Sequence, residues 1–280
     1  MTRMLALPLP CGHRIERVAV VIPAHDEEDH LEQALQAVQR SADALHRIRP
    51  DVDTRVTVVL DSCTDGSAAI TAGYAATDPR ISTLEVSYRS AGASRAAGVR
   101  ASGIDVPPWR PPGQRWTPPP GARLTWLANT DADSRVPENW LVRQLEFAEA
   151  GADAVLGSVE PDPAGMDPEL LRRWRERHPF HEDHPHIYGA NFGVRASAYL
   201  TAGGFARITS EEDRTLVHSL RSRAFTVTAT DSTRVMTSGR THARVPRGFG
   251  TYLQSLGHLL PPPEAEDSLT PGPGRSTLKE

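Results

Sequence analysis

The sequence predicts an α/β protein in which a mostly parallel sheet is flanked by helices on both faces. Apolar runs that do not alternate with polar residues are typical of strands buried on both sides. Segments with the apolar spacing of helices lie between these runs, and this alternation indicates parallel strands joined by helices. With 280 residues, 39% of them hydrophobic, the chain is long enough for a full core.

The first two strand–helix units are the clearest. Residues 18–22 form an unbroken apolar strand that ends at Pro23. The acidic residues 27–29 follow at the start of a helix, where negative charge is favourable. That helix has one apolar stripe, made of Leu31, Ala34, Leu35 and Val38. Residues 56–60 form a second strand, and the turn 64–67 leads into a helix of small residues.

The next elements continue the same alternation. We expect a third helix over about residues 91–102 and a strand over 124–128. Pro137 is expected at the first position of a further helix, which Gly151 closes. Residues 153–159 then form another apolar strand, so the sheet extends through at least four strands.

One domain is expected over residues 16–255, preceded by an N-terminal extension over residues 1–15. Seven prolines crowd residues 104–123 and remove backbone donors, so this stretch is expected to be a surface insertion loop. Residues 256–280 are rich in proline and glycine, and we expect them to form a disordered tail.

Charge and composition argue against several classes of protein. A net charge of −4 offers no general attraction to nucleic acid or an anionic membrane, and no apolar run approaches the length of a membrane span. Cys11 and Cys63 are too few for a disulfide framework, and two prolines break the short apolar N-terminus, so a cytoplasmic location is expected. The only lysine is Lys279, which excludes a P-loop lysine and an internal lysine Schiff base.

Acidic residues stand just beyond three of the expected strands. Asp26 follows the first and Asp61 the second, while Asp131 and Asp133 flank one small residue after the strand 124–128. In a parallel sheet these strand ends share the edge at which ligands bind. Several carboxylates there need cations to offset their repulsion. The pattern indicates a metal-dependent enzyme acting on a nucleotide or another polyphosphate, and a solvated acidic turn is the alternative for any single residue.

Six segments of the chain resemble, in the same order, the motifs of glycosyltransferase family 2. They are residues 20–28 (VVIPAHDEE), 59–67 (VLDSCTDGS), 129–134 (NTDADS), 189–195 (GANFGVR), 203–205 (GGF) and 211–213 (EED). Each motif alone is weak, but the ordered set is specific and spans about residues 16–255. The resemblance implies a GT-A fold and a hexosyltransferase-type enzyme that transfers a sugar from a nucleotide-diphosphate sugar, preferably a UDP-sugar, to an acceptor hydroxyl.

The resemblance also implies a pocket for the nucleotide-sugar donor. Its expected residues are Pro23, Ala24, Asp26, Glu27, Asp61, Arg95, Asp131 and Asn191. Asp61 would accept a hydrogen bond from the nucleobase, and the guanidinium of Arg95 would approach the diphosphate. Many relatives have two adjacent aspartates after the second strand, whereas this chain has Leu60 before Asp61. Because one carboxylate of that pair is lost, the base of the donor stays open.

The metal site and the catalytic base are implied in the same way. Asp131 and Asp133 match the DxD motif, which implies that they hold Mg²⁺ or Mn²⁺ against the diphosphate, and His242 would complete the metal shell. Asp213 matches the base that takes the acceptor proton in an inverting displacement, with Glu212 supporting it. The alternatives are an acidic first helical turn for this pair and a solvated histidine for His242.

A loop with four histidines precedes the 189–195 motif; they are His178, His181, His184 and His186. Their irregular spacing and the lack of a nearby cysteine argue against zinc. We expect the loop to face the acceptor, because its side chains offer many hydrogen-bonding atoms and little apolar area to join the core.

Two other functions are open to this sequence. A sugar-phosphate nucleotidyltransferase also uses carboxylate-bound Mg²⁺, but it usually begins with a glycine-rich loop and a lysine near the phosphates, which this chain lacks. A catalytically silent nucleotide-binding module would keep the fold, and the presence of Asp131, Asp133 and Asp213 argues against it. The sequence does not identify the sugar, the acceptor or the oligomeric state.

Overall fold

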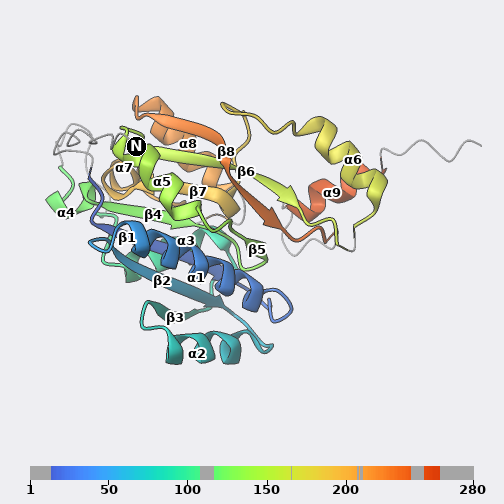
Figure 1. Cartoon of the computed structure of the whole chain (residues 1–280), viewed down its shortest axis with the longest axis horizontal. Helices are drawn as coiled ribbons and strands as arrows, with labels where there is room; N and C mark the ends of the chain where they lie inside the picture. The colour runs from blue at the N-terminus through green and yellow to red at the C-terminus, as the bar shows by residue number, and fades with distance from the viewer. Residues whose placement is uncertain are drawn as a thin grey trace, which may run out of the picture.

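The computed structural model describes residues 14–107, 117–164, 166–206, 208, 211–240 and 249–258, which form a sheet with helices on both faces (Figure 1). The strands are β1 (Arg17–Ala24), β2 (Asp53–Asp61), β3 (Ile81–Val86), β4 (Thr125–Asn129), β5 (Ser134–Arg135), β6 (Ala154–Pro161), β7 (Phe192–Arg195) and β8 (Val227–Thr237). The helices are α1 (Leu31–Ile48), α2 (Ser67–Thr77), α3 (Ala91–Ala101), α4 (Pro120–Arg123), α5 (Trp140–Glu149), α6 (Pro168–Arg177), α7 (Ala196–Ala202), α8 (Glu212–Ser222) and α9 (Phe249–His258), with one 3₁₀ turn, η1 (Gly189–Asn191).

The strands are hydrogen-bonded in the order β3-β2-β1-β4-β7-β6-β8-β5. Strands β1 to β4 are mutually parallel, and β6 is parallel to β8. Strand β7 is antiparallel to both of its neighbours, and the short β5 is antiparallel to β8. The predicted mostly parallel sheet is therefore confirmed.

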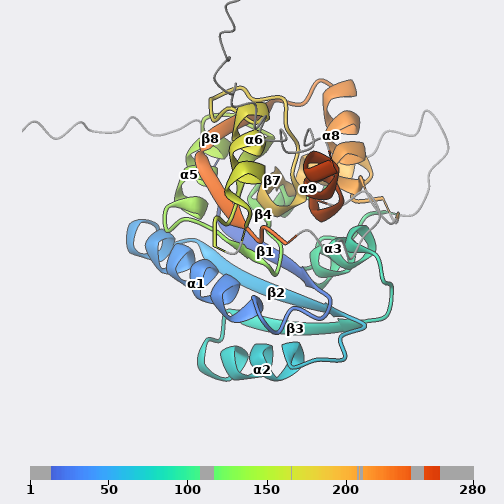
Figure 2. The same cartoon turned by 90° about the vertical axis from the view of Figure 1, so that its right-hand side faces the viewer.

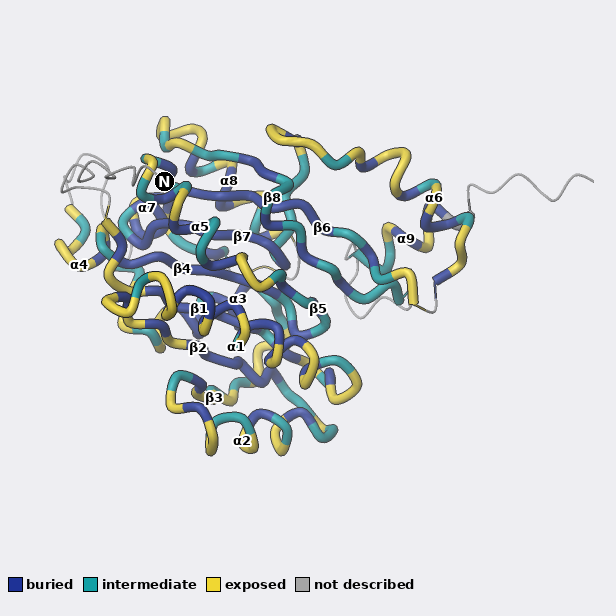
Figure 3. The backbone as a smooth tube through the Cα atoms, in the orientation of Figure 1, coloured by how far each residue is buried: buried dark blue, intermediate teal, exposed yellow. Residues whose placement is uncertain are grey.

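The core lies in two layers because successive strand residues point to opposite faces of the sheet. On one face, α1, α2 and α5 pack over Val20 and Trp126. On the other face, α3, α7 and α8 pack over Val21 and Leu127. Figure 3 shows the resulting buried centre of the sheet between more exposed helices. This double burial explains why the central strands read as unbroken apolar runs.

A third, smaller apolar cluster lies outside the sheet, where α6 packs against α9. Its buried residues are Met166, Leu170, Leu171, Trp174, Leu253 and Leu256. Both helices project from one end of the molecule (Figure 1). Within the described parts of the chain, the helices are too short or too polar to span a membrane.

Some boundaries differ from those expected. Helix α5 begins at Trp140, because Pro137 lies in the preceding turn and its carbonyl accepts a hydrogen bond from the Trp140 N–H. The predicted insertion over 104–123 ends in α4, and its central part, 108–116, lies outside the described residues, as do residues 1–13. Helix α9 runs into the first residues of the predicted tail, of which 259–280 are also outside the described part.

Candidate active site

The acidic residues converge at one edge of the sheet. Strand β1 is parallel to β2 and β4, so the carboxyl ends of these three strands lie side by side. Asp26 and Glu27 follow β1, Asp61 ends β2, and Asp131 and Asp133 follow β4. The topology thus brings together the carboxylates that the sequence places after separate strands.

Asp133 is connected to the C-terminal part of the chain by the β5–β8 pair. Ser134 pairs with Thr237, and the Thr237 hydroxyl donates a 3.2 Å hydrogen bond to the Asp133 carboxylate. Three residues beyond Thr237, the Arg240 guanidinium lies 3.0 Å from Asp133 Oδ2. The same guanidinium donates two hydrogen bonds to the Glu27 carboxylate, of 2.7 and 2.6 Å. Arg240 therefore bridges an acid after β1 and an acid after β4.

Arg95 forms a second bridge of this kind from α3. Its guanidinium donates to the carboxylates of Asp131 and Glu212. Arg95 and Glu212 are both only 4% exposed, so this ion pair is almost fully desolvated. There are thus two bridges, one from Glu27 through Arg240 to Asp133 and one from Asp131 through Arg95 to Glu212, and a single residue separates Asp131 from Asp133 in the chain. We call these two arginines and four carboxylates the charged row. Its members are Glu27, Arg240, Asp133, Asp131, Arg95 and Glu212.

Glycines allow the backbone to approach this row closely. A Cβ at Gly189 would lie 2.6 Å from Arg95 Nη2, and a Cβ at Gly92 would lie 2.9 Å from the Cβ of Glu212. Both are closer than a van der Waals contact permits. The glycines at these two positions therefore leave the space in which Arg95 and Glu212 meet.

Replacing Gly189 by Ala is expected to push the Arg95 guanidinium away from Asp131 and Glu212. A misplacement of about 1 Å in such a site costs roughly 10²-fold in rate. Gly73→Ala is the matched control, since Gly73 lies on α2 with no atom within 4 Å of an added Cβ. That control should keep full activity and gain about 0.5–1 kcal/mol of stability. Equal turnover by the two variants would contradict this role of Gly189.

Three acids of the charged row, Asp131, Asp133 and Glu212, lie where burial disfavours their ionised form. Burial raises the pKa of Asp131, an effect that Arg95 opposes and Asp133 reinforces. Burial also raises the pKa of Asp133, against the attraction of Arg240, and Glu27 adds to the increase. The pKa of Glu212 is raised by burial as well, and Arg95 opposes this. In each case burial disfavours the ionised carboxylate, and a neighbouring guanidinium group favours it.

Asp61 and Asp26 organise the loops beside the row. The Asp61 carboxylate accepts hydrogen bonds from the backbone N–H groups of residues 88–90 and from the Ser94 hydroxyl, at 2.7 to 3.0 Å. Burial disfavours its charge, but these donors outweigh burial and lower its pKa. Asp26 accepts the Thr64 N–H at 2.6 Å, which lowers the Asp26 pKa. If Asp61 contacts a nucleobase as predicted, it does so with a carboxylate that already accepts hydrogen bonds from the backbone of residues 88–90.

Strained backbone accompanies these loops. Four of the six non-glycine residues with positive φ among those described lie beside the row, namely Asp26, Ser62, Arg89 and Glu211, with φ of 51°, 57°, 49° and 67°. Left-handed backbone at non-glycine residues is unfavourable and concentrates at functional sites. Its distribution here supports the carboxyl edge as the functional site.

The other expected donor residues are placed differently. Pro23 and Ala24 end β1 beside the row, and Ala24 is 3% exposed. The Asn191 side chain is not brought to the row. It is 1% exposed, accepts a hydrogen bond from Trp140 and donates to the carbonyls of Ser158 and Thr233. Its amide therefore joins α5, β6 and β8 inside the core.

The base predicted from the sequence lies at the start of α8. Asp213 is in the first turn and partly exposed, and its Oδ1 accepts the Arg214 N–H at 2.7 Å. The adjacent Glu212 points into the core and is held by Arg95. The predicted metal ligand His242 and the neighbouring Arg244 fall outside the described residues.

Asp26, Cys63 and Asp65 form another group of possible metal ligands among the described residues. Ligand atoms of Asp26, Cys63 and Asp65 lie within 4.8 Å of one another. The carboxylates of Asp26 and Asp65 already accept backbone N–H groups of Thr64, Glu28 and Ser67. We therefore interpret this group as a junction between the loops after β1 and β2.

One expectation for the loop that contains the four histidines is wrong. His178 and His184 are 8% and 2% exposed, so they join the interior, contrary to the prediction that the loop adds little to the core. His178 stacks on Trp174 with ring centroids 4.5 Å apart, donates through Nδ1 to the Trp174 carbonyl and receives the Tyr252 hydroxyl at Nε2. The sequence could not show this, because α9, which carries Tyr252, is distant along the chain.

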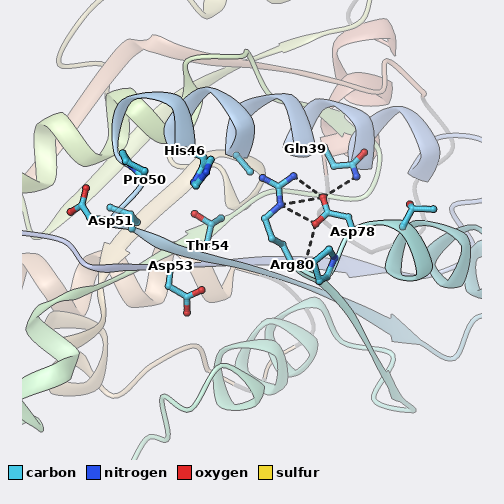
Figure 4. Close-up of a pocket in the computed structure, with 12 residues that line it drawn as sticks. Gln39, His46, Pro50, Asp51, Asp53, Thr54, Asp78 and Arg80 are labelled. Carbon is cyan, nitrogen blue, oxygen red and sulfur yellow. Dashed lines mark hydrogen bonds and ion pairs between the residues drawn. The ribbon is translucent and has the colours of Figure 1, made fainter.

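One cavity lies beside the candidate site, and another lies away from it. One of about 470 Å³ lies beside Asp133 and Arg240 and is also lined by His30, Arg135 and Asp162. A larger one of about 690 Å³ lies at the amino end of β2, away from the carboxyl edge (Figure 4). Its acids already have cationic partners, since Asp78 binds Arg80 at 2.7 Å, Asp51 binds Arg49 and Asp53 binds Arg55.

Comparisons with known proteins match this architecture. The family model described as Glycosyl transferase family 2 matches residues 19–200. The structure is similar to TarS 1–349 of S. aureus in complex with UDP, with a TM-score of 0.55 and 12% identity. It is also similar to the mannosyltransferase PcManGT of Pyrobaculum calidifontis in complex with GDP-Man and Mn²⁺, with a TM-score of 0.56 and 18% identity.

These likenesses cover 80% and 89% of this chain but only 61% and 64% of the respective solved chains. This chain thus spans less than two thirds of the length of either. No curated protein matches its sequence. The likenesses confirm the GT-A fold predicted from the motifs.

Proposed function

Since this chain belongs to glycosyl transferase family 2, we propose that it is a cytoplasmic, metal-dependent, inverting glycosyltransferase. It would transfer a sugar from a nucleotide-diphosphate sugar, preferably a UDP-sugar, to an acceptor hydroxyl. The observation that carries the proposal is the charged row, because Arg95 joins Asp131 to Glu212 at the start of α8, while Arg240 joins Asp133 to Glu27 after β1. This arrangement supports donor binding and proton transfer at the carboxyl edge of the sheet, which is where ligands bind in parallel α/β folds.

The residues present fit a hard divalent cation. Asp131 and Asp133 offer the carboxylate oxygens that Mg²⁺ and Mn²⁺ prefer. The row contains four carboxylates and two guanidinium groups, so it carries an excess of negative charge even before Asp213 is included. A divalent cation held by Asp131 and Asp133 would offset this excess and, when bound, would stabilise the charge of the leaving diphosphate.

The proposed base is Asp213. It lies in the first turn of α8, and its Oδ1 accepts a hydrogen bond from the Arg214 N–H. Only its Oδ1 accepts a hydrogen bond from a described residue, so Oδ2 can take the acceptor proton as the hydroxyl oxygen attacks the anomeric carbon. Glu212 would support this step by holding the first turn of α8 against Arg95.

Metal dependence leads to a direct prediction. In the presence of Mn²⁺, Asp133→Ala should weaken UDP binding, because one carboxylate of the metal site is lost. Once EDTA is added, the variant and the parent should differ little. Titration calorimetry with UDP measures both conditions. Equal Mn²⁺-dependent affinities would contradict the proposed metal site.

A donor screen tests the activity itself. The protein should release UDP from at least one UDP-sugar in the presence of Mn²⁺, and faster than it releases GDP or dTDP from the matching donors. Release of pyrophosphate from UTP and a sugar phosphate would instead identify a nucleotidyltransferase. A protein that binds UDP without turnover of any donor would be a silent module.

A further inference from the structure

The carboxylate of Asp61 is enclosed by the loop that follows the neighbouring strand. Asp61 ends β2, and its register partner is Val86 at the end of β3. Residues 87–90 then lead from β3 into α3, and Figure 2 shows this connection at one side of the sheet. Asp61 is only 4% exposed, so its carboxylate lies between the two strand ends and α3.

Five hydrogen-bond donors of the described chain surround this carboxylate. Oδ1 accepts the backbone N–H groups of Tyr88 and Arg89 at 2.7 and 2.8 Å, and the Ser62 hydroxyl at 3.2 Å. Oδ2 accepts the backbone N–H of Ser90 at 3.0 Å and the Ser94 hydroxyl at 2.7 Å. An ionised carboxylate has about four lone-pair positions. None is therefore left for the imide N–H of a uracil.

The backbone of the loop is arranged to bind an anion. Arg89 has a φ of 49°, in the left-handed region that few non-glycine residues adopt. The turn lets three successive N–H groups, those of residues 88–90, point at one carboxylate. Such nests of N–H groups bind anions. Here the anion is the side chain of Asp61, which therefore stabilises the strained turn.

Two of these contacts fix the start of α3, the helix that carries Arg95. Ser90 is the N-cap of α3, since its hydroxyl accepts the Ala93 N–H at 3.3 Å, and its own N–H is held by Asp61. Ser94 lies in the first turn, and its hydroxyl is held by the same carboxylate. Arg95 is the next residue, so a displacement of this turn would move its guanidinium within the charged row.

Further along, α3 packs directly on the sheet. A Cβ at Gly98 would lie 2.5 Å from Cγ1 of Val21 and 2.9 Å from Cγ2 of Val59, so the helix backbone touches side chains of β1 and β2. The contact at Gly98 and the hydrogen bonds to Asp61 together determine the direction of α3, and with it the place of Arg95.

We propose that Asp61 is a positioning residue and not a nucleobase contact: its carboxylate holds the start of α3 so that Arg95 reaches the acids of the charged row. This inference rests on the proposed function, because it concerns the donor site of the same enzyme. Leu60, which stands where relatives have the other aspartate, is 3% exposed within the apolar core. Any preference for one nucleobase then depends on residues other than these two.

Nucleotide binding separates the two roles of Asp61. Uracil carries an N–H at the ring atom N3, whereas cytosine carries an acceptor there, so a carboxylate that contacts this edge favours UDP. Asp61→Asn keeps the shape but adds an amide N–H, which would shift such a contact toward CDP. We expect the ratio of the Kd values for UDP and CDP, measured by isothermal titration with Mn²⁺, to be the same in the parent and in Asp61→Asn. A ratio shifted toward CDP would overturn the proposal.

A double-mutant cycle tests the link to Arg95 without any nucleotide. Chemical denaturation at pH 7 gives the unfolding equilibrium constants of the parent, Asp61→Ala, Arg95→Met and the double variant. If Asp61 acts through Arg95, the losses are not additive, and the double variant should be more stable than their sum predicts by about tenfold in this constant. Asp61→Asn takes the place of Asp61→Ala in the cycle where the latter does not fold. Additive losses would overturn the proposal.

Asp78→Ala is the matched control for this cycle. Asp78 is also a buried acid that accepts a backbone N–H, that of Arg80 at 2.9 Å, but it lies before the amino end of β3. Its loss of stability should therefore add to that of Arg95→Met.

Turnover provides the third measurement. Asp61→Asn should lower kcat for UDP release about 10²-fold, the effect of displacing a group of the site by about 1 Å, and change KM less. Asp78→Asn should keep the parental kcat, and an equally unchanged kcat in Asp61→Asn would contradict the proposal. Failure of the proposed function is a different outcome, because the parent would then release UDP from no donor, while the double-mutant cycle would still measure the coupling of Asp61 to Arg95.

Discussion

Replacing Asp213 by Asn should lower sugar transfer by roughly 10²–10⁴-fold, the loss expected when a general base is removed. Asn keeps the shape of the side chain and an oxygen for the Arg214 N–H, so α8 should begin unchanged. Affinity for UDP should stay close to that of the parent, because the donor contacts are assigned to other residues. Steady-state rates and UDP binding, measured on the same preparations, separate the two effects.

The neighbouring Glu212 cannot easily replace this base, because it is 4% exposed and bound to Arg95. Asp105→Asn is a suitable control, since it alters an exposed carboxylate paired with Arg100 and should leave transfer unchanged. Transfer by Asp213→Asn at the parental rate would mean that another group takes the acceptor proton.

Replacing Arg95 by Met should produce the largest loss of stability, about 3–5 kcal/mol in the free energy of unfolding, because Glu212 is left buried without its partner. Chemical denaturation at pH 7 measures this loss. Burial already raises the pKa of Glu212, and removing Arg95 raises it further. The loss of stability in Arg95→Met is therefore largest at a pH above the raised pKa of Glu212. It becomes smaller as the pH falls through that pKa, because protonated Glu212 no longer needs a cation.

Two variants make this result specific. Arg143→Met removes an exposed ion pair with Glu146, whose partners are 39% and 54% exposed, and should cost at most about 1 kcal/mol. Arg95→Met/Glu212→Leu removes both buried charges and should recover much of the loss. If Arg95→Met were no less stable than Arg143→Met, the buried pair would not hold α3 to α8.

The central strands could be predicted because each carries its own local pattern. Residues 18–22 and 56–60 are apolar on both sides, since they lie in β1 and β2 between two layers of helices. Strand β3 was missed because it is an edge strand with exposed Ser82 and Thr83. Strand β7 was missed because its four residues are too few for a periodic signal.

The sequence predicts the place of some candidate site residues in the fold, but not the surroundings of others. Asp131, Asp133, Glu212 and Asp213 stand at the strand and helix ends where the motifs place them. The burial of Asn191 has no local signal, because its partners Trp140, Ser158 and Thr233 belong to three different elements. The burial of His178 likewise depends on α6 and α9 packing together.

The sequence by itself determined the α/β class, the strands that end in acids and the family, because apolar periodicity and short motifs are local properties of the chain. Only the tertiary structure decided which charges offset one another. Arg95 and Glu212 are 117 positions apart, and Arg240 and Glu27 are 213 apart. Such contacts depend on strand order and on the β5–β8 pair, which no local pattern encodes. The pairing of charges across the charged row is thus a property of the folded chain alone.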